Sequence, residues 1–235
     1  MTAKNIQIEL EATASPQKKE LLPYFFKTGK GQYGEGDKFI GVVVPDIRKI
    51  AKANNTISIT EVEILLNSDY HECRMCALFI LIEHFKKAKK EDKLQKQIVD
   101  FYLSYTYRIN NWDLVDLSCK DILGKYLVNK EDRSILYRLA ESDLLWDQRI
   151  AVISTFPLIK KEDYKDIIQL SEYFLTHEHD LMHKAVGWLL RETGKMNKNV
   201  LISFLDRHYT NMPRTMLRYS IEKLSPEEKA HYMKK

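Results

Sequence analysis

The chain is poor in cysteine, glycine and proline, and it has no long hydrophobic run. Its 235 residues include 3 cysteines, 8 glycines and 6 prolines. Three scattered cysteines are too few for a disulfide framework. No segment approaches the roughly 18 consecutive apolar residues that a membrane-spanning helix needs. The first residues, MTAKNIQIEL, lack the charged and then apolar layout of a signal peptide, so we expect a cytoplasmic protein.

Composition argues against a disordered protein, and the net charge alone does not decide whether the protein binds nucleic acid. Hydrophobic residues make up 44% and charged residues 30% of the chain, as in soluble globular proteins and unlike disordered ones. The net charge of +4, from 37 basic and 33 acidic residues, is too small to indicate nucleic-acid binding by itself. Only a one-sided arrangement of the basic residues would indicate it.

Helical patterns dominate the chain, and strand signals are almost absent. The only β-like run is FIGVVV (39–44), which is short and ends at Pro45. Elsewhere apolar residues recur at helical spacing, as Leu78, Ile82 and Phe85 do. Helix-start signals stand at Ser15-Pro16, at Pro45-Asp46, and at Ser225-Pro226 with Glu228 three residues after the serine. The sequence therefore predicts an all-α fold.

The predicted helices come in pairs. Their second members can be aligned at Arg74, Val115, Arg149, Lys184 and Arg218, in steps of 41, 34, 35 and 34 residues. A repeat of this period is typical of HEAT-like helical repeats, which form an α-α superhelix with a concave face. A single irregular helical bundle is the alternative. We expect one HEAT-like domain over 1–235, with N-terminal helices and a glycine-rich loop in 1–44 and helix-pair repeats in 45–235. The predicted pairs are 58–67 with 70–87, 90–106 with 111–128, 131–142 with 146–159, 163–175 with 181–193, and 197–208 with 212–223.

The same alignment places basic residues on the second helices. Arg74, Arg149, Lys184 and Arg214 or Arg218 would then project into a concave, basic groove. Recurring arginine and lysine side chains are what a phosphate backbone requires. A set of solvated surface charges is an equally good explanation of this pattern.

Three short motifs contain the three tryptophans. In NWDLVD, Asp116 lies four residues after Trp112, so the two side chains share one helix face. In WDQR, Arg149 follows Trp146 by three residues, and in HKAVGWLLRE, Trp188 lies one turn beyond Lys184. Core packing is the usual explanation of a tryptophan. An aromatic ring and an acid on one face also suit a binding site.

The motifs resemble those of the AlkD-type DNA glycosylases of alkylation repair, which are built from HEAT-like repeats. The resemblance rests on W-D-x-V-D (112–116), W-x-Q-R (146–149) and K-A-x-G-W-x-L-R-E (184–192), in this order, and it covers about residues 40–220. GVVVPDIRKI is similar to the family's G-x-x-x-P-x-x-R segment and contains Arg48, which we expect to contact DNA. The resemblance implies that Asp116 is the catalytic carboxylate. It also implies that Trp112 and Trp188 are aromatic walls around the lesion and that Arg149 anchors DNA.

The remaining residues of these motifs have simpler explanations. We expect Trp146 to pack in the core and Asp113 to be a structural or helix-terminal carboxylate. Arg149 pairing with an acid to support the fold is the alternative to its role at DNA.

The chemistry of such a site follows from the leaving group. Alkylation of a purine at ring nitrogen 3 or 7 makes the base cationic, and it then departs as a neutral molecule without a general acid. Breaking the glycosidic bond builds oxocarbenium-like charge on the sugar. A nearby carboxylate stabilises this charge and orients or deprotonates the attacking water. Electron-rich indole faces also attract a cationic base.

Other candidate sites have simpler explanations. The loop KTGKGQYGEGD (27–37) lacks the setting of a P-loop, so we expect a plain flexible loop. A mobile DNA-facing loop, with Tyr33, Lys27 and Lys30 at the DNA backbone or minor groove, is the alternative. Cys73 and Cys76 lie in an apolar helix and are expected to be buried reduced thiols. The segment HEHDLMH (177–183) is expected to be a polar turn rather than a zinc site, so we predict no metal and no cofactor.

These observations favour a monofunctional DNA glycosylase. It would excise cationic alkylpurines, 3-methyladenine and 7-methylguanine, from duplex DNA, and its partner would be DNA with alkylated bases. Because no amine nucleophile is clearly placed, we predict no lyase step. We expect no obligate protein partner and predict a monomer. The concave face of a solenoid offers no obvious deep pocket, so extrusion of the base stays open. The alternatives are a non-catalytic protein that binds distorted or branched DNA, and a HEAT protein-interaction scaffold.

Overall fold

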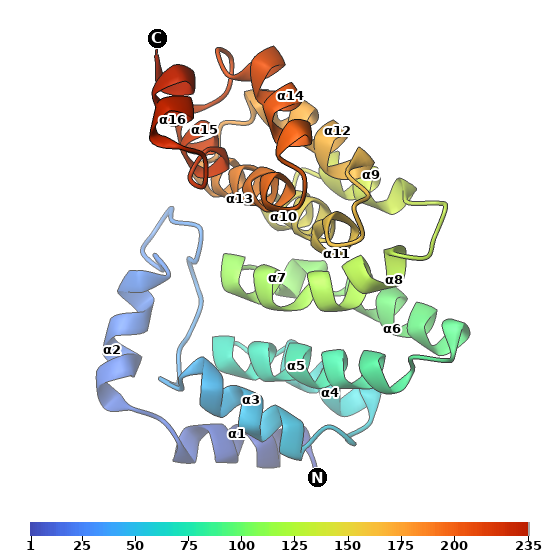
Figure 1. Ribbon diagram of the computed structural model, residues 1–235. Helices are drawn as coiled ribbons and strands as arrows, with labels where there is room; N and C mark the ends of the chain where they lie inside the picture. Colours follow the sequence, from blue (N-terminus) through green and yellow to red (C-terminus); the bar gives the residue numbers. More distant parts are fainter. Residues whose placement is uncertain (235) are drawn as a thin grey trace. The chain divides into compact units, whose positions relative to one another are not determined.

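A computed structural model describes residues 1–234, which form helices joined by turns and short loops (Figure 1). Within this range no strand forms, and the only β-type pairing is an isolated bridge between Lys38 and Tyr70. The all-α prediction is confirmed. The chain divides into two compact units, a first unit of Met1–Ser118 and a second unit that begins at Cys119. That they act as one domain stays a prediction.

The first unit is arranged around one long, buried helix, α5 (His71–Lys87). Helices α1, α3, α4, α6 and α7 all pack against α5 (Figure 1). Of its 17 residues, 13 are buried, so α5 lacks the polar face of a surface helix. The other elements are α1 (Ala3–Ala12), α2 (Pro16–Phe25), α3 (Val44–Ala53), α4 (Ile59–Leu66), α6 (Asp92–Ser104), the 3-10 turn η1 (Thr106–Arg108) and α7 (Trp112–Ser118).

In the second unit, the helices follow one repeated packing pattern. Helices α10, α13 and α15 pack one against the next, while α9 covers α10, and α12 and α14 cover α13 (Figure 1). Two predicted pairs are confirmed, α9 with α10 and α12 with α13, whereas α14 packs mainly on α13 rather than on α15 as predicted. The elements are a π-helical turn η2 (Lys120–Gly124), α8 (Lys125–Leu127), α9 (Ser134–Ala140), α10 (Leu145–Ile153), α11 (Phe156–Ile159), α12 (Lys165–Tyr173), η3 (Phe174–Thr176), α13 (Asp180–Met196), α14 (Lys198–His208), α15 (Arg214–Ser220) and α16 (Pro226–Met233).

The predicted helix starts are confirmed. The Ser15 side chain accepts from the Lys18 N–H at the start of α2, with Pro16 in its first turn. Ser225 and Glu228 form a reciprocal capping box at α16. Each cap satisfies backbone donors that a helix end leaves without partners. No helix in the described part of the chain is long and apolar enough to cross a membrane.

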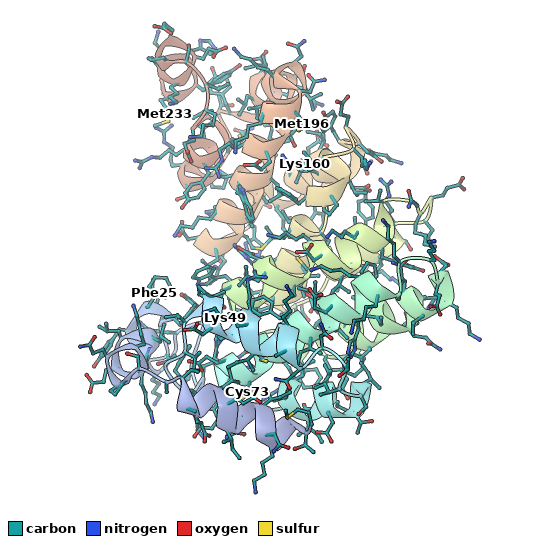
Figure 2. The ribbon with its side chains drawn as sticks, turned by 60° about the horizontal axis from the view of Figure 1, so that its bottom comes forward. Phe25, Lys49, Cys73, Lys160, Met196 and Met233 are labelled. Atoms are coloured by element: carbon teal, nitrogen blue, oxygen red, sulfur yellow. The ribbon has the colours of Figure 1, made fainter. Side chains whose placement is uncertain are left out.

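The cysteine prediction is also confirmed. Cys73 and Cys76 are fully buried on α5, and Figure 2 shows Cys73 among the helices of the first unit. Burial raises the pKa of Cys73 to about 11 and that of Cys76 to about 12. Both therefore stay protonated at neutral pH, which disfavours the thiolate that redox chemistry needs.

The one β-like run is extended but does not pair with another strand. Instead, the buried Glu72 carboxylate accepts the N–H groups of Ile40, Gly41 and Val42, at 2.9, 2.7 and 3.2 Å. A carboxylate on α5 therefore takes the place of a neighbouring strand, since buried N–H groups need an acceptor. The chain turns into α3 immediately afterwards.

We expect Glu72→Gln to lower the free energy of unfolding by about 1–3 kcal/mol, because the amide presents a donor to a backbone N–H. Urea unfolding followed by circular dichroism measures this loss. Glu83→Gln is the control, because Glu83 lies further along α5 and makes only a partly exposed pair with Lys86. Equal stability of Glu72→Gln and Glu83→Gln would contradict this account.

In the second unit, Gly187 allows α13 and α15 to approach closely. A Cβ added at Gly187 would lie 2.5 Å from the Met216 oxygen and 2.6 Å from the Tyr219 Cβ. Backbone atoms cannot move aside as a flexible side chain can. The glycine of the K-A-x-G-W segment is therefore explained by packing.

We expect Gly187→Ala to destabilise the protein by about 1–3 kcal/mol, because overpacking outweighs the better helix propensity of alanine. Thermal unfolding measures the change. Gly194→Ala on the same helix is the control, since its added Cβ meets only the Leu201 side chain, which can rotate. A wild-type melting temperature for Gly187→Ala would refute the packing explanation.

Candidate functional site

A cavity of about 460 Å³ lies within the first unit, between α2, the segment 39–47, α5 and α7. Its walls are mostly apolar, and four aromatic side chains take part, together with three carboxylates. The apolar and aromatic residues are Leu22, Phe25, Phe26, Phe39, Val42, Val43, Val44, Pro45, Ile47, Met75, Trp112 and Leu117, and the polar ones are Lys18, His71, Glu72, Asp113 and Asp116. Cavities of this size and lining are typical ligand sites.

Trp112 and Asp116 both line this cavity. They come from the first turn of α7 and the next, so their four-residue spacing brings them to one side of the helix. Both side chains are half-buried and keep some contact with solvent. Asp116 is therefore neither enclosed in the core nor separated from the indole. Their chemical roles stay predictions.

Aromatic rings from α2 hold Trp112. Its ring centroid lies 5.6 Å from that of Phe26 and 5.9 Å from that of Phe25. Phe26 is buried, whereas Phe25 is 62% exposed and is the last residue of α2 (Figure 2). The Trp112 indole N–H donates to the Tyr33 hydroxyl at 3.3 Å. The glycine-rich loop thus contacts the wall of the cavity through Tyr33.

The glycine-rich loop is a series of turns that closes back on itself. Gly31 and Gly36 have φ angles of 75° and 88°, which a side chain would disfavour. At its far end, Asp37 anchors the loop by accepting from Arg74 Nη2 at 2.7 Å and from Asn110 Nδ2 at 2.8 Å. Lys30 is exposed. Tyr33 and Asp37 therefore fix two points of a segment expected to be plain and flexible.

Of the three carboxylates at the cavity, two make contacts that give them a structural role. Glu72 accepts three backbone N–H groups, as described above. Asp113 is 6% exposed, accepts the Leu114 N–H at 2.8 Å, and lies 2.9 Å from His71 Nε2. Asp113 is thus the structural carboxylate that the sequence suggested. Asp116 differs from the other two carboxylates because it is partly exposed, whereas Glu72 and Asp113 are buried.

His71 is a buried member of the site that the sequence did not reveal. Its Nε2 lies 2.9 Å from Asp113 Oδ2 and its Nδ1 lies 3.4 Å from Asp37 Oδ2. Burial alone would lower its pKa, but the charge and hydrogen bond of Asp113, with the bond to Asp37, raise the pKa of His71 from 6.5 to about 9. Burial would raise the pKa of Asp37, yet its bonds to His71 and Asn110 and the charge of Arg74 lower it. The only feature of the sequence that could have indicated this role is the polar segment His-Glu-x-Arg at the start of an otherwise apolar helix.

The position of Arg74 corrects one prediction. Its side chain is 2% exposed and pairs with Asp37, while Nη1 donates to the Ser68 carbonyl at 2.8 Å. Arg74 therefore cannot project into an open groove as expected, because α5 is covered on all sides. The repeat alignment placed Arg74 on the correct helix, but it could not show that other helices cover that helix.

The candidate residues of the second unit have different environments. Arg149 is 5% exposed and its Nη1 donates to the Leu181 carbonyl at 2.5 Å, so it does not project from the surface as expected. Lys184 pairs with Asp180 at 2.6 Å. Trp188 is half-buried, with its ring centroid 6.0 Å from that of Phe156. Trp146 is also half-buried. The roles of Arg149, Lys184 and Trp188 at DNA stay predictions.

Three further predicted DNA contacts are surface arginines. Arg214 and Arg218 are exposed on α15 in the second unit, and Arg48 is exposed on α3 in the first. The Arg48 guanidinium lies 4.1 Å from the centroid of the Phe79 ring, which holds its stem against the protein. All three arginines present charge to solvent.

The histidines of 177–183 have partners within the second unit. His177 Nε2 lies 2.8 Å from Gln148 Oε1, and His179 caps α13 by accepting the Leu181 N–H at 3.1 Å. Residues 177–179 form the polar turn that was expected, and residues 180–183 form the first turn of α13.

Comparison with known proteins identifies the family. The family model described as DNA alkylation repair enzyme matches residues 6–224. A solved structure named as a predicted DNA alkylation repair enzyme from Enterococcus faecalis has the same fold, with a TM-score of 0.74. It is 18% identical, and the match covers 91% of this chain and 98% of that one. No curated protein matches the sequence. The chain therefore belongs to the DNA alkylation repair enzyme family, which confirms the resemblance found in the sequence.

The pairing of His71 predicts how stability depends on pH. Its raised pKa means that the folded state keeps a proton that the unfolded state releases above 6.5. The stabilisation is therefore complete below pH 6.5 and is lost as the pH rises to about 9. We expect the free energy of unfolding to fall over this window, by up to about 3 kcal/mol.

Urea unfolding at pH 6.5, 8 and 9 measures this slope. His71→Gln has no titrating ring at this position, so its slope should be smaller than that of the wild type. A wild-type stability that is constant or rises over the same window would contradict the assignment of a paired imidazolium.

Proposed function

We propose that the protein is a monofunctional DNA glycosylase that excises cationic alkylpurines, with 3-methyladenine and 7-methylguanine as its bases. The observation that carries this proposal is the shared position of Asp116 and Trp112 at one aromatic cavity in the first unit. Membership of the DNA alkylation repair enzyme family supports the substrate class. The proposed substrate is duplex DNA that contains an alkylated base.

Asp116 is the proposed catalytic carboxylate. As the glycosidic bond breaks, positive charge develops on the sugar, and an ionised carboxylate beside it lowers the energy of that state. The same group orients or deprotonates the attacking water. Because the cationic base leaves as a neutral molecule, one carboxylate is sufficient.

Trp112 contributes through its electron-rich face. An indole attracts a cationic base more than a neutral one by about 0.5–2 kcal/mol. The Phe25 and Phe26 rings and the Tyr33 hydroxyl hold that indole in place. Discrimination between damaged and normal purines would then depend on charge and on a fixed aromatic wall.

DNA binding is assigned to positively charged side chains outside the cavity. The exposed Lys30, Arg48, Arg214 and Arg218 are proposed to contact phosphates, and each neutralised phosphate adds to the salt dependence of binding. Tyr33 and Lys184 are proposed to contact the DNA backbone as well. Trp188 as a second aromatic wall and Arg149 as an anchor are proposals that follow from the resemblance.

The first test replaces the carboxylate. We expect Asp116→Asn to slow release of free base from methylated duplex DNA at least about 100-fold, because the transition state loses its compensating charge. Single-turnover release, measured by chromatography of the freed base, separates chemistry from binding. DNA affinity should change little.

Asp121→Asn is the matched control, because this partly exposed aspartate, five residues later in the sequence, pairs with Lys125 and is absent from the cavity lining. It should release base at the wild-type rate. No release by the wild type, or equal release by wild type and Asp116→Asn, would overturn the proposal. Salt-sensitive DNA binding without any release would indicate a non-catalytic DNA-binding protein instead.

The second test concerns the product. Lys18 is the one lysine among the described residues that line the cavity, and it is exposed on α2. A monofunctional glycosylase leaves an intact abasic site, so sodium borohydride should trap no covalent protein–DNA complex. Trapping that disappears in Lys18→Met would show a lyase step and contradict the monofunctional assignment.

A further inference from the structure

The start of α7 is tied to the rest of the first unit by a buried polar network of four charged residues. His71 stands at its centre, between Asp113 on α7 and Asp37 at the end of the glycine-rich loop. Asp37 also accepts from Arg74 on α5 and from Asn110, two residues before α7. The network thus joins the loop, α5 and the beginning of α7.

Both ring nitrogens of His71 face carboxylates, which fixes its charge. A neutral imidazole has one N–H and one lone pair, and the lone pair would face a carboxylate oxygen unfavourably. Only the imidazolium donates from both nitrogens. The raised pKa of about 9 agrees with this geometry. The positive charges of His71 and Arg74 then balance the negative charges of Asp37 and Asp113.

The other surroundings of the His71 ring are uncharged or already satisfied. The Phe39 ring stacks on it with a centroid distance of 4.9 Å, and the Phe26 ring lies at the same distance, tilted. The neighbouring Glu72 accepts three backbone N–H groups instead. The ring is 2% exposed, so no water shell replaces a lost carboxylate contact.

Helix α7 is the first part of a longer helical run, because the backbone keeps helical angles at Cys119 and Gly124 and continues through η2 into α8. The start of this run is the end that needs such a tie, since the first N–H groups of a helix have no partner within it and helix ends fray. Asp113 lies in its first turn, next to Trp112 and three residues before Asp116. A shift of the Asp113 carboxylate therefore moves both candidate site residues.

We propose that His71 is a positioning residue, which holds Asp113 and the start of α7 so that Asp116 and Trp112 keep their places at the cavity. The inference rests on the proposed glycosylase function for its effect on rate. Displacement by about 1 Å can cost a reaction about 100-fold, so a loosened α7 is enough to slow base release. Loss of the ring proton leaves one carboxylate without its donor and has the same effect.

The experiment compares the wild type with His71→Gln, whose amide can still donate to one carboxylate, from pH 7 to 9.7. We expect the wild-type single-turnover rate to fall by half near pH 9. His71→Gln should be at least tenfold slower at pH 7.5, with less than a threefold change in DNA Kd, and should show no alkaline fall. His84→Gln, at the other end of α5 and away from the cavity, should behave like the wild type.

A readout independent of activity uses the Trp112 indole N–H resonance, assigned with a Trp112→Phe sample. We expect this resonance to shift in His71→Gln, and in the wild type above pH 9, but not in His84→Gln. An unchanged resonance would overturn the positioning role whether or not base is released. A rate loss in His71→Gln matched by an equal loss of DNA affinity, with an unchanged indole signal, would assign His71 to general stability alone.

If the wild type releases no base while the resonance shifts as expected, the glycosylase proposal fails and the positioning of α7 stands. If the wild type releases base and His71→Gln does so at the same rate, the inference fails and the glycosylase proposal stands.

Discussion

The compensation of buried carboxylates is the constraint on which the first unit depends. Glu72 and Asp113 line an apolar cavity and the Asp37 side chain is buried against His71 and Arg74, so that an uncompensated charge on any of them would cost several kcal/mol. Each has a partner suited to its place: an arginine and a histidine for Asp37, the same histidine for Asp113, and three backbone N–H groups for Glu72. These bonds connect α5 to the glycine-rich loop, to the segment 39–43 and to α7. The arrangement of the cavity follows from them.

Within this arrangement, Asp113 and Asp116 lie in different environments, although they are only three residues apart on one helix. Asp113 is turned into the buried network, where His71 compensates it. Asp116 lies at the cavity with part of its surface open. One helix thus presents a structural acid and a candidate catalytic acid to two different environments. Under the proposed function, this separation would let the site hold a charge close to a sugar without destabilising the core.

Local patterns predicted much of the fold. Helical periodicity and the caps at Ser15 and Ser225 gave the all-α architecture, because these features depend on residues within one turn of each other. The alignment of the second helices gave some of the pairs, such as α9 with α10. The spacing of Trp112 and Asp116 likewise placed both on one side of α7.

Contacts between distant segments were beyond the same reasoning. His71 meets Asp37 and Asp113 across 34 and 42 residues, and nothing local marks either partner. Arg74 and Arg149 were expected at a surface, because an alignment of helices identifies a shared face but not whether another layer covers it. The β-like run failed to become a strand because the Glu72 carboxylate satisfies its N–H groups. In each case burial of a polar group, rather than periodicity, decided the outcome.

The most direct measurement of the central claim uses a stable mimic of the charged sugar. A duplex that carries a pyrrolidine abasic nucleotide, protonated at neutral pH, resembles the oxocarbenium-like state, whereas a tetrahydrofuran abasic nucleotide has the same shape without the charge. The account predicts that the wild type binds the pyrrolidine duplex at least about tenfold more tightly, and that Asp116→Asn binds both duplexes equally. Equal binding of the two duplexes by the wild type, or an unchanged preference in Asp116→Asn, would contradict it.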